Sequence, residues 1–123
     1  MNPRYPIYIV SKGRWHTRLT MKALGWLGCP YTVIIEEQEY HKYAAVLDPS
    51  CLLVLPEQYL HDYETMDDRG DIISKGPGAA RNFAMDHSRQ LGFRRHWVMD
   101  DNLDDFHRLT GNVKAPVRTG ACF

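Results

Sequence analysis

The feature that most constrains the fold is a set of four short apolar runs spaced along the whole chain. They are Tyr5–Val10, Tyr31–Ile35, Cys51–Leu55 and His96–Met99. Each run has the length of one strand, is rich in apolar residues, and is followed by polar or turn-forming residues. The pattern therefore predicts four buried β-strands.

Three segments predicted to be helical separate these strands. We expect helices over residues 17–27 and 77–91, where apolar side chains recur at spacings of three and four, and over residues 36–47, which begin with an acidic turn and end before Asp48-Pro49. Thr17 is the predicted cap of the first helix, and Gly92 ends the third. The acidic start of the second helix suits the positive end of a helix dipole.

Alternation of apolar strands with helices predicts an α/β protein in which a mainly parallel sheet is covered by helices on both faces, a three-layer α/β/α arrangement. The length of 123 residues fits one domain over residues 1–123. Residues 57–75 lack a sustained period and are expected to form an exposed loop with room for one helical turn. Residues 111–123 also lack a period, so we expect this tail to fray.

Composition and charge argue against several classes of protein. Fifteen basic residues balance fifteen acidic ones, so the overall charge does not steer the chain towards nucleic acid or an anionic membrane. The opening apolar run is too short for a signal peptide or a membrane span, which predicts a cytoplasmic protein with no membrane partner. Cys29, Cys51 and Cys122 lie far apart, which favours reduced thiols over a zinc site. The oligomeric state stays open.

Polar loops follow three of the predicted strands. They are Ser11–Arg14, Glu36–Glu39 and Asp100–Asn102. Ligands of open parallel sheets bind at the carboxyl ends of the strands, so these loops predict a site. Two carboxylates and an amide oxygen in Asp100–Asn102 suit Mg²⁺ or Mn²⁺, and the alternative is an ordinary capped acidic turn.

A second constellation is Ser74–Asn82, which contains Gly76, Gly78 and Arg81. Small residues allow close approach of the backbone to a ligand, and the start of a helix offers free amide donors to an anion. Arg81 can bind phosphate through two parallel hydrogen bonds. The alternative is a glycine-proline helix start with a surface arginine.

Taken in order, Gly76–Ala84 (Gly-Pro-Gly-Ala-Ala-Arg-Asn-Phe-Ala) and then His96–Asn102 (His-Trp-Val-Met-Asp-Asp-Asn) resemble the GT-A glycosyltransferases, particularly the family 2-like members. In these enzymes a glycine-led Ala-Arg-Asn helix precedes a strand that ends in a DXD-type motif. The resemblance covers Tyr5 to about Leu109. Within that group the chain is most similar to the phage-encoded TET-associated glycosyltransferases, which implies hydroxymethylated pyrimidines in DNA as acceptors and a host cytoplasm as location.

The resemblance implies a GT-A fold, a nucleoside-diphosphate sugar donor with a UDP-sugar favoured, and Mn²⁺ or Mg²⁺ as cofactor. It implies donor-binding roles for Ser11, Lys12, Arg14, Glu36, Glu37, Gly78, Arg81, Asn82, Asp100 and Asp101. It implies metal binding by Asp100, Asp101 and Asn102, with Asp101 facing the sugar or ribose. The metal would act as a Lewis acid that stabilises the departing nucleoside diphosphate.

The sequence departs from this family in two respects. Asn102 takes the place of the usual last carboxylate, and only residues 103–123 follow it, where such enzymes place their acceptor elements and catalytic base. Asp101 and Asp104 are the predicted catalytic residues, with Asp105 and His107 as further candidates for the base. A truncated or split chain is an open alternative.

Three other functions stay open at this point. The first is a donor-binding module without transfer, which the short C-terminal region favours. The second is a nucleotidyltransferase, for which Ser11–Arg14 is a faint signature. The third is a small binding protein of flavodoxin-like order without a metal. The aromatic residues Tyr40 and Tyr43 are expected to pack in the core or at its rim and have no predicted functional role.

Overall fold

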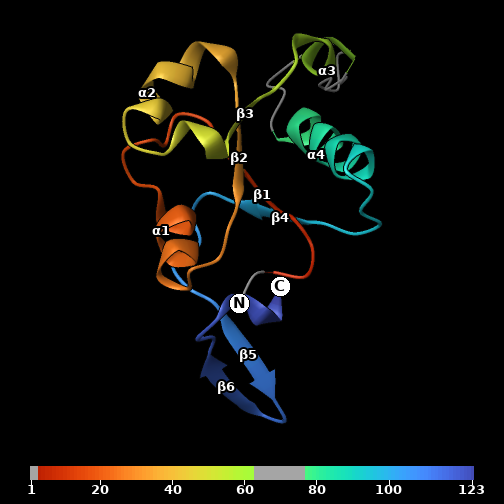
Figure 1. Cartoon of the computed structure of the whole chain (residues 1–123). Coiled ribbons are helices and arrows are strands. Elements are labelled where there is room, and N and C mark those ends of the chain that lie inside the picture. The colour runs from red at the N-terminus through yellow and green to blue at the C-terminus, as the bar shows by residue number, and fades with distance from the viewer. Residues whose placement is uncertain (1–2, 63–76) are drawn as a thin grey trace, which may run out of the picture.

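A computed structural model describes residues 3–62 and 77–123 of the chain. Its centre is a four-stranded parallel sheet with the order β3-β2-β1-β4 (Figure 1). The strands are β1 (Ile7–Val10), β2 (Thr32–Ile35), β3 (Leu52–Val54) and β4 (Trp97–Asp100). All four predicted strands are confirmed, each within two residues of its expected ends.

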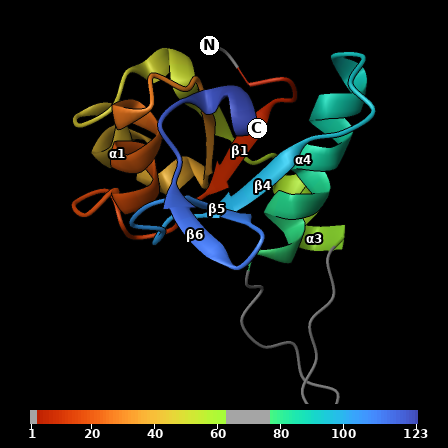
Figure 2. The same cartoon turned by 90° about the horizontal axis from the view of Figure 1, so that it is seen from below.

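Helices cover both faces of the sheet (Figures 1 and 2). One face carries α1 (Leu19–Trp26) and α2 (Tyr40–Ala44), and the other carries α3 (Glu57–Asp62) and α4 (Gly78–Gln90). Short 3₁₀ turns precede α2 and β3, at Glu37–Glu39 and Pro49–Cys51. The predicted α/β class is confirmed. The helices of the described ranges include none that is long and apolar enough to cross a membrane.

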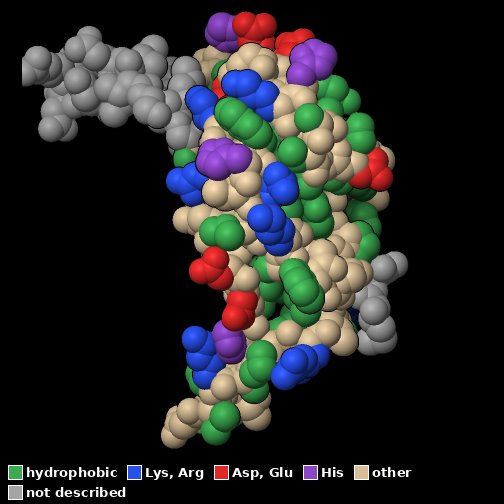
Figure 3. Space-filling model, turned by 90° about the vertical axis from the view of Figure 1, so that its left-hand side faces the viewer, with side chains coloured by type: hydrophobic (Ala, Val, Ile, Leu, Met, Phe, Trp, Pro, Cys, Tyr) green, Lys and Arg blue, Asp and Glu red, His purple; other side chains and the backbone are tan. Residues whose placement is uncertain are grey.

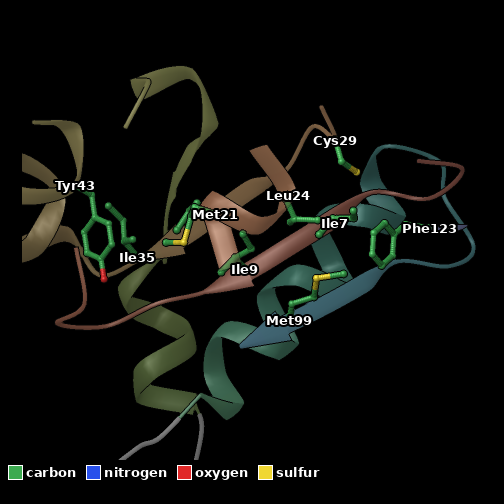
Figure 4. Packing of buried hydrophobic residues seen from close by; sticks show 10 residues of the cluster. Ile7, Ile9, Met21, Leu24, Cys29, Ile35, Tyr43, Met99 and Phe123 are labelled. Atoms are coloured by element: carbon green, nitrogen blue, oxygen red, sulfur yellow. The ribbon is translucent and has the colours of Figure 1, made fainter. Parts of the chain in front are cut away.

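Alternating side chains of the buried strands divide the core in two. Ile7 and Ile9 of β1 lie in the larger cluster beneath α1 and α2, where Figure 4 shows them near Met21 and Leu24 of α1. Tyr8, between them, lies in the smaller cluster beneath α3 and α4. This alternation is the expected consequence of a strand whose successive side chains point to opposite faces, both of which are covered.

The start of α1 differs from the prediction. Thr17 is not the cap, because Arg18 adopts the left-handed conformation (φ 51°) and the helix begins after it, at Leu19. The Thr17 hydroxyl instead donates to the Arg14 carbonyl at 3.4 Å. The backbone amide of Thr20, in the first turn of the helix, points to the carbonyl of Asp101 at 3.5 Å. The loop after β4 thus occupies the place where a capping side chain was expected.

The expectation that the tail frays was wrong. Residues 107–116 form an antiparallel hairpin of β5 (His107–Thr110) and β6 (Val113–Pro116), and a 3₁₀ turn follows at Gly120–Cys122. Phe123 is buried, and its ring packs edge-on against Trp97 and Phe106 at centroid distances of 5.6 and 5.1 Å. Aromatic packing on the core therefore fixes a segment that has no periodicity of its own.

The expected exposed loop over residues 57–75 begins with a helix, α3. One helical turn was foreseen there, and the remainder of that prediction lies outside the described residues. The same holds for Ser74, Lys75 and Gly76 of the glycine-rich constellation.

Candidate functional site

A cavity of about 340 Å³ opens at the carboxyl ends of β1, β2 and β4. It is lined by parts of all three polar loops that the sequence singled out: Ser11, Lys12, Arg14, Glu36, Asp100, Asp101 and Asn102. The remaining wall is mostly apolar and comes from Val10, Ile34, Ile35, Leu55, Leu60, Pro77 and Ala80. Cavities of this size with an apolar wall and a few convergent polar groups are typical of small-molecule sites.

A directed chain of hydrogen bonds lies beneath the polar side of this cavity. The Ser11 hydroxyl donates to Oδ2 of Asp101 at 2.8 Å, and its oxygen lies 2.6 Å from the Tyr43 hydroxyl. Since Ser11 has a single proton, Tyr43 donates to Ser11. The Tyr43 oxygen in turn accepts from the backbone amide of Arg14 at 3.2 Å. Burial raises the pKa of the Tyr43 phenol, which keeps this donor protonated.

The carboxylate of Asp101 is therefore engaged on both oxygens. Oδ1 accepts from the Arg14 guanidinium at 3.2 Å while Oδ2 accepts from Ser11, and the residue is only 8% exposed. A buried carboxylate requires such donors to offset its lost hydration. Asp101 joins the loop after β1 to the loop after β4, which fixes the shape of the cavity.

Thr20 holds the same loop from the other side. Its hydroxyl donates to the backbone carbonyl of Asp100 and accepts from the backbone amide of Leu103 at 2.9 Å. Thr20 lies in the first turn of α1 and is fully buried. The turn that carries Asp100–Asn102 is thereby anchored to a helix as well as to the sheet.

Asp100 is the exposed carboxylate of the site. Its side chain is 60% exposed, and Oδ1 accepts from Nη2 of Arg81 at 2.9 Å. This contact joins α4 to the end of β4 and brings the arginine of the Ala-Arg-Asn run to the acidic turn. Asn102 is exposed and also lines the cavity.

Lys12 and Glu36, which both line the cavity, form an ion pair. Nζ of Lys12 lies 2.9 Å from Oε2 of Glu36, whose side chain is only 16% exposed. The hydrogen bond and the charge of Glu36 raise the pKa of Lys12, so the ammonium remains charged. The pair places a cation and an acceptor of ligand hydrogen bonds side by side.

Other predicted site residues lie outside the cavity wall. Glu37 is exposed in the 3₁₀ turn after β2, while Gly78 and Asn82 belong to the first turns of α4. Asp104 is exposed on the loop between β4 and β5. Asp105 pairs with Nδ1 of His107 at 3.1 Å, and β5 begins at His107, so this segment is an extended loop followed by a strand.

Two residues of the site were missed. Tyr43 was expected only to pack, and Thr20 was not singled out, yet both make buried hydrogen bonds to the loops of the site. Tyr43 lies four residues before the apolar Leu47, a spacing that predicts an inward-facing side chain but not its hydrogen bonds to the loop after β1. Thr20 carries no comparable local signal.

Residues 5–123 match the protein family described as TET-Associated Glycosyltransferase. Searches of curated proteins and of solved structures gave no match. The family match spans both the sheet and the C-terminal hairpin and includes every residue that lines the cavity. The chain therefore belongs to the TET-associated glycosyltransferase family and is a glycosyltransferase.

Proposed function

We propose that the chain transfers a sugar from a nucleoside diphosphate, with UDP favoured, to the hydroxyl of a hydroxymethylated pyrimidine in DNA. The observation that carries this proposal is the cavity in which Lys12, Glu36 and Asp100–Asn102 meet an apolar wall at the strand ends. The family name supplies the reaction class, and its association with TET favours an oxidised pyrimidine as acceptor. The match favours this activity over a nucleotidyltransferase.

The apolar part of the cavity wall suits the nucleobase of the donor, and the charged side chains suit its diphosphate. Ile34, Leu55 and Leu60 offer apolar surface for the nucleobase, with Glu36 beside them as an acceptor for a base or ribose proton. Lys12 and Arg81 carry the positive charges that a diphosphate requires. The pair formed by Lys12 and Glu36 would then open as each partner takes up its ligand group.

The donor set of the acidic turn fits Mg²⁺ or Mn²⁺. Asp100 and Asn102 are both exposed at the cavity and supply hard oxygen ligands. Mg²⁺ sites in nucleotide enzymes commonly use one or two side chains and complete their coordination with phosphate and water. Both carboxylate oxygens of Asp101 already accept hydrogen bonds, one from Ser11 and one from Arg14. Asp101 is therefore better suited to positioning the turn than to binding metal. When bound, the ion would neutralise the charge that develops on the departing diphosphate.

Transfer forms a bond between the acceptor oxygen and the anomeric carbon of the donor. The bond from that carbon to the diphosphate oxygen breaks, and the nucleoside diphosphate leaves with the electron pair. A base must take the proton of the acceptor hydroxyl. We assign this role to Asp104, which is exposed beside the acidic turn, while Asp101 is held in the buried hydrogen-bond chain.

The test is calorimetric titration of UDP, and then GDP, into the protein with and without Mn²⁺. Asp100→Asn should abolish the metal-dependent part of the binding. Asp105→Asn is the matched control, because its side chain is 59% exposed against 60% for Asp100 and also pairs with a basic residue. Mass spectrometry of a duplex that contains 5-hydroxymethylcytosine, after incubation with a UDP-sugar, tests transfer itself.

Either of two results would contradict parts of the proposal. Nucleotide binding that needs no metal and survives Asp100→Asn would contradict the proposal that the acidic turn binds a metal ion. No binding of either nucleotide under any of these conditions would remove the donor assignment of the cavity.

A further inference from the structure

The hairpin of β5 and β6 extends away from the body of the protein. Figure 1 shows it projecting from the β4 side of the sheet, and Figure 2 shows it at the end to which the β1 and β4 arrows point. It begins at His107, shortly after the acidic turn at the cavity. All of β5 is exposed, as is β6 except for a half-buried Ala115.

Within residues 3–62 and 77–123, the base of the hairpin is the part that is fixed to the core. The backbone amide of Val117 donates to the carbonyl of Phe106 at 2.9 Å, and the Phe106 ring packs against Phe123. Beyond this base Leu109 is 76% exposed and Val113 is 66% exposed. A two-stranded ribbon that buries neither face is marginally stable in water, and its exposed apolar residues are typical of a contact surface.

The charge of this segment identifies the chemistry of its partner. The whole chain has a formal net charge of zero, but residues 106–123 contain Arg108, Lys114 and Arg118 and neither Asp nor Glu. All three basic residues are exposed. Figure 3 shows basic side chains on the hairpin, at the bottom of the view. A basic, otherwise neutral ribbon is complementary to a polyanion.

The shape of the ribbon suits one part of DNA. The major groove of B-DNA is about 12 Å wide and admits a two-stranded β-ribbon. The substituent at C5 of a pyrimidine also lies in that groove. The hydroxymethyl group that would accept the sugar therefore faces the groove that the ribbon can enter.

We propose that the β5–β6 hairpin docks into the major groove of the acceptor DNA and positions the modified pyrimidine at the donor cavity. This inference rests on the proposed function, which supplies the modified pyrimidine as the acceptor. The contact with DNA is argued from the exposed basic hairpin itself. In the strand register Leu109 lies opposite Lys114 and Arg108 opposite Ala115, so Arg108 and Lys114 project from opposite faces of the ribbon. When the ribbon enters the groove edge-on, with one face towards each strand of the duplex, each cation can reach one of the two phosphate backbones that border the groove.

The test compares binding of a duplex containing 5-hydroxymethylcytosine by fluorescence anisotropy over a series of salt concentrations. The binding constant falls as salt rises, and each lost phosphate contact makes the slope of log K against log salt less steep by about 0.9. Arg108→Ala combined with Lys114→Ala should therefore make the slope less steep by about 1.8 and raise the Kd about 10- to 60-fold at 0.1 M salt. The control is Arg94→Ala combined with Arg95→Ala, which removes the same charge from exposed positions between α4 and β4.

Transfer assays separate this inference from the proposed function. The hairpin variant should lose transfer to the duplex but keep transfer to the free nucleoside 5-hydroxymethyl-2′-deoxycytidine. Equal salt slopes and equal duplex transfer in the wild type and the hairpin variant would overturn the inference while leaving the function intact. A wild type that binds DNA through the hairpin but transfers no sugar would overturn the function alone. No DNA binding by the wild type would overturn the docking role of the hairpin.

Discussion

Replacement of Thr20 by valine tests how the acidic turn is held. Valine has nearly the volume of threonine but lacks the hydroxyl that donates to the Asp100 carbonyl and accepts from the Leu103 amide. Thr20 is 0% exposed, so water cannot replace either bond at the side chain. Two hydrogen bonds at about 0.5–1.5 kcal/mol each, together with backbone groups left unpaired, predict a loss of about 2–3 kcal/mol in the free energy of unfolding.

Urea denaturation monitored by tryptophan fluorescence measures this loss. With an m-value of about 2 kcal/mol/M, the midpoint should fall by about 1–1.5 M while m stays constant. Thr17→Val is the matched control, since the exposed Thr17 hydroxyl makes only a long contact of 3.4 Å to a carbonyl. Its effect should stay within about 0.5 kcal/mol.

A third variant distinguishes the contribution of the Thr20 hydroxyl to stability from that of its methyl group. Thr20→Ser keeps both hydrogen bonds and loses one buried methyl, which costs about 1 kcal/mol. Thr20 does not hold the turn through its hydroxyl if Thr20→Val unfolds at the same urea concentration as Thr17→Val, or if Thr20→Ser is as unstable as Thr20→Val.

Three further predictions concern other parts of the chain. Phe123→Ala should destabilise the fold by about 3–5 kcal/mol in urea because the ring is buried, whereas a frayed tail would give no change. Iodoacetamide at pH 8 should alkylate the exposed Cys122 well before Cys29, whose pKa burial raises; peptide mass spectrometry would show the order, and equal rates would contradict it. Burial raises the Tyr43 pKa above 10.0, so its stabilisation is present below pH 10 and is lost as the pH rises through the folded-state value. Tyr43→Phe should remove the part of the decline in melting temperature above about pH 10 that comes from ionisation of Tyr43, and an unchanged decline would refute this.

The sequence allowed the strands and the parallel class to be predicted because both depend on local apolar runs and their alternation with helices. It did not predict the strand order, in which β4 lies beside β1 rather than beyond β3. Pairing of β1 with β4 depends on contacts between distant segments, which no local pattern records.

For the site, too, the features that depend on local sequence could be predicted, and those that depend on contacts between distant segments could not. The loops at the strand ends could be identified because each follows its own strand, and the cavity unites parts of all three. The inner hydrogen bonds could not be predicted, since Tyr43 and Thr20 reach Ser11 and the Asp100 carbonyl across tertiary distances. The hairpin did leave a local signal, because the dipeptide Gly111-Asn112 between two four-residue segments is typical of a tight turn, and Gly111 has φ 61°.

The long-range pairing of β1 with β4 also has a consequence for the order of folding. The contact from Ser11 to Asp101 spans 90 positions, and the contact from Leu103 to Thr20 spans 83. During synthesis the ribosome must therefore release the chain as far as Leu103 before the pocket exists, and until then one edge of β1 lacks its partner strand. Proteins dominated by such distant contacts fold slowly, so assembly of this site should be the late step in the maturation of the protein.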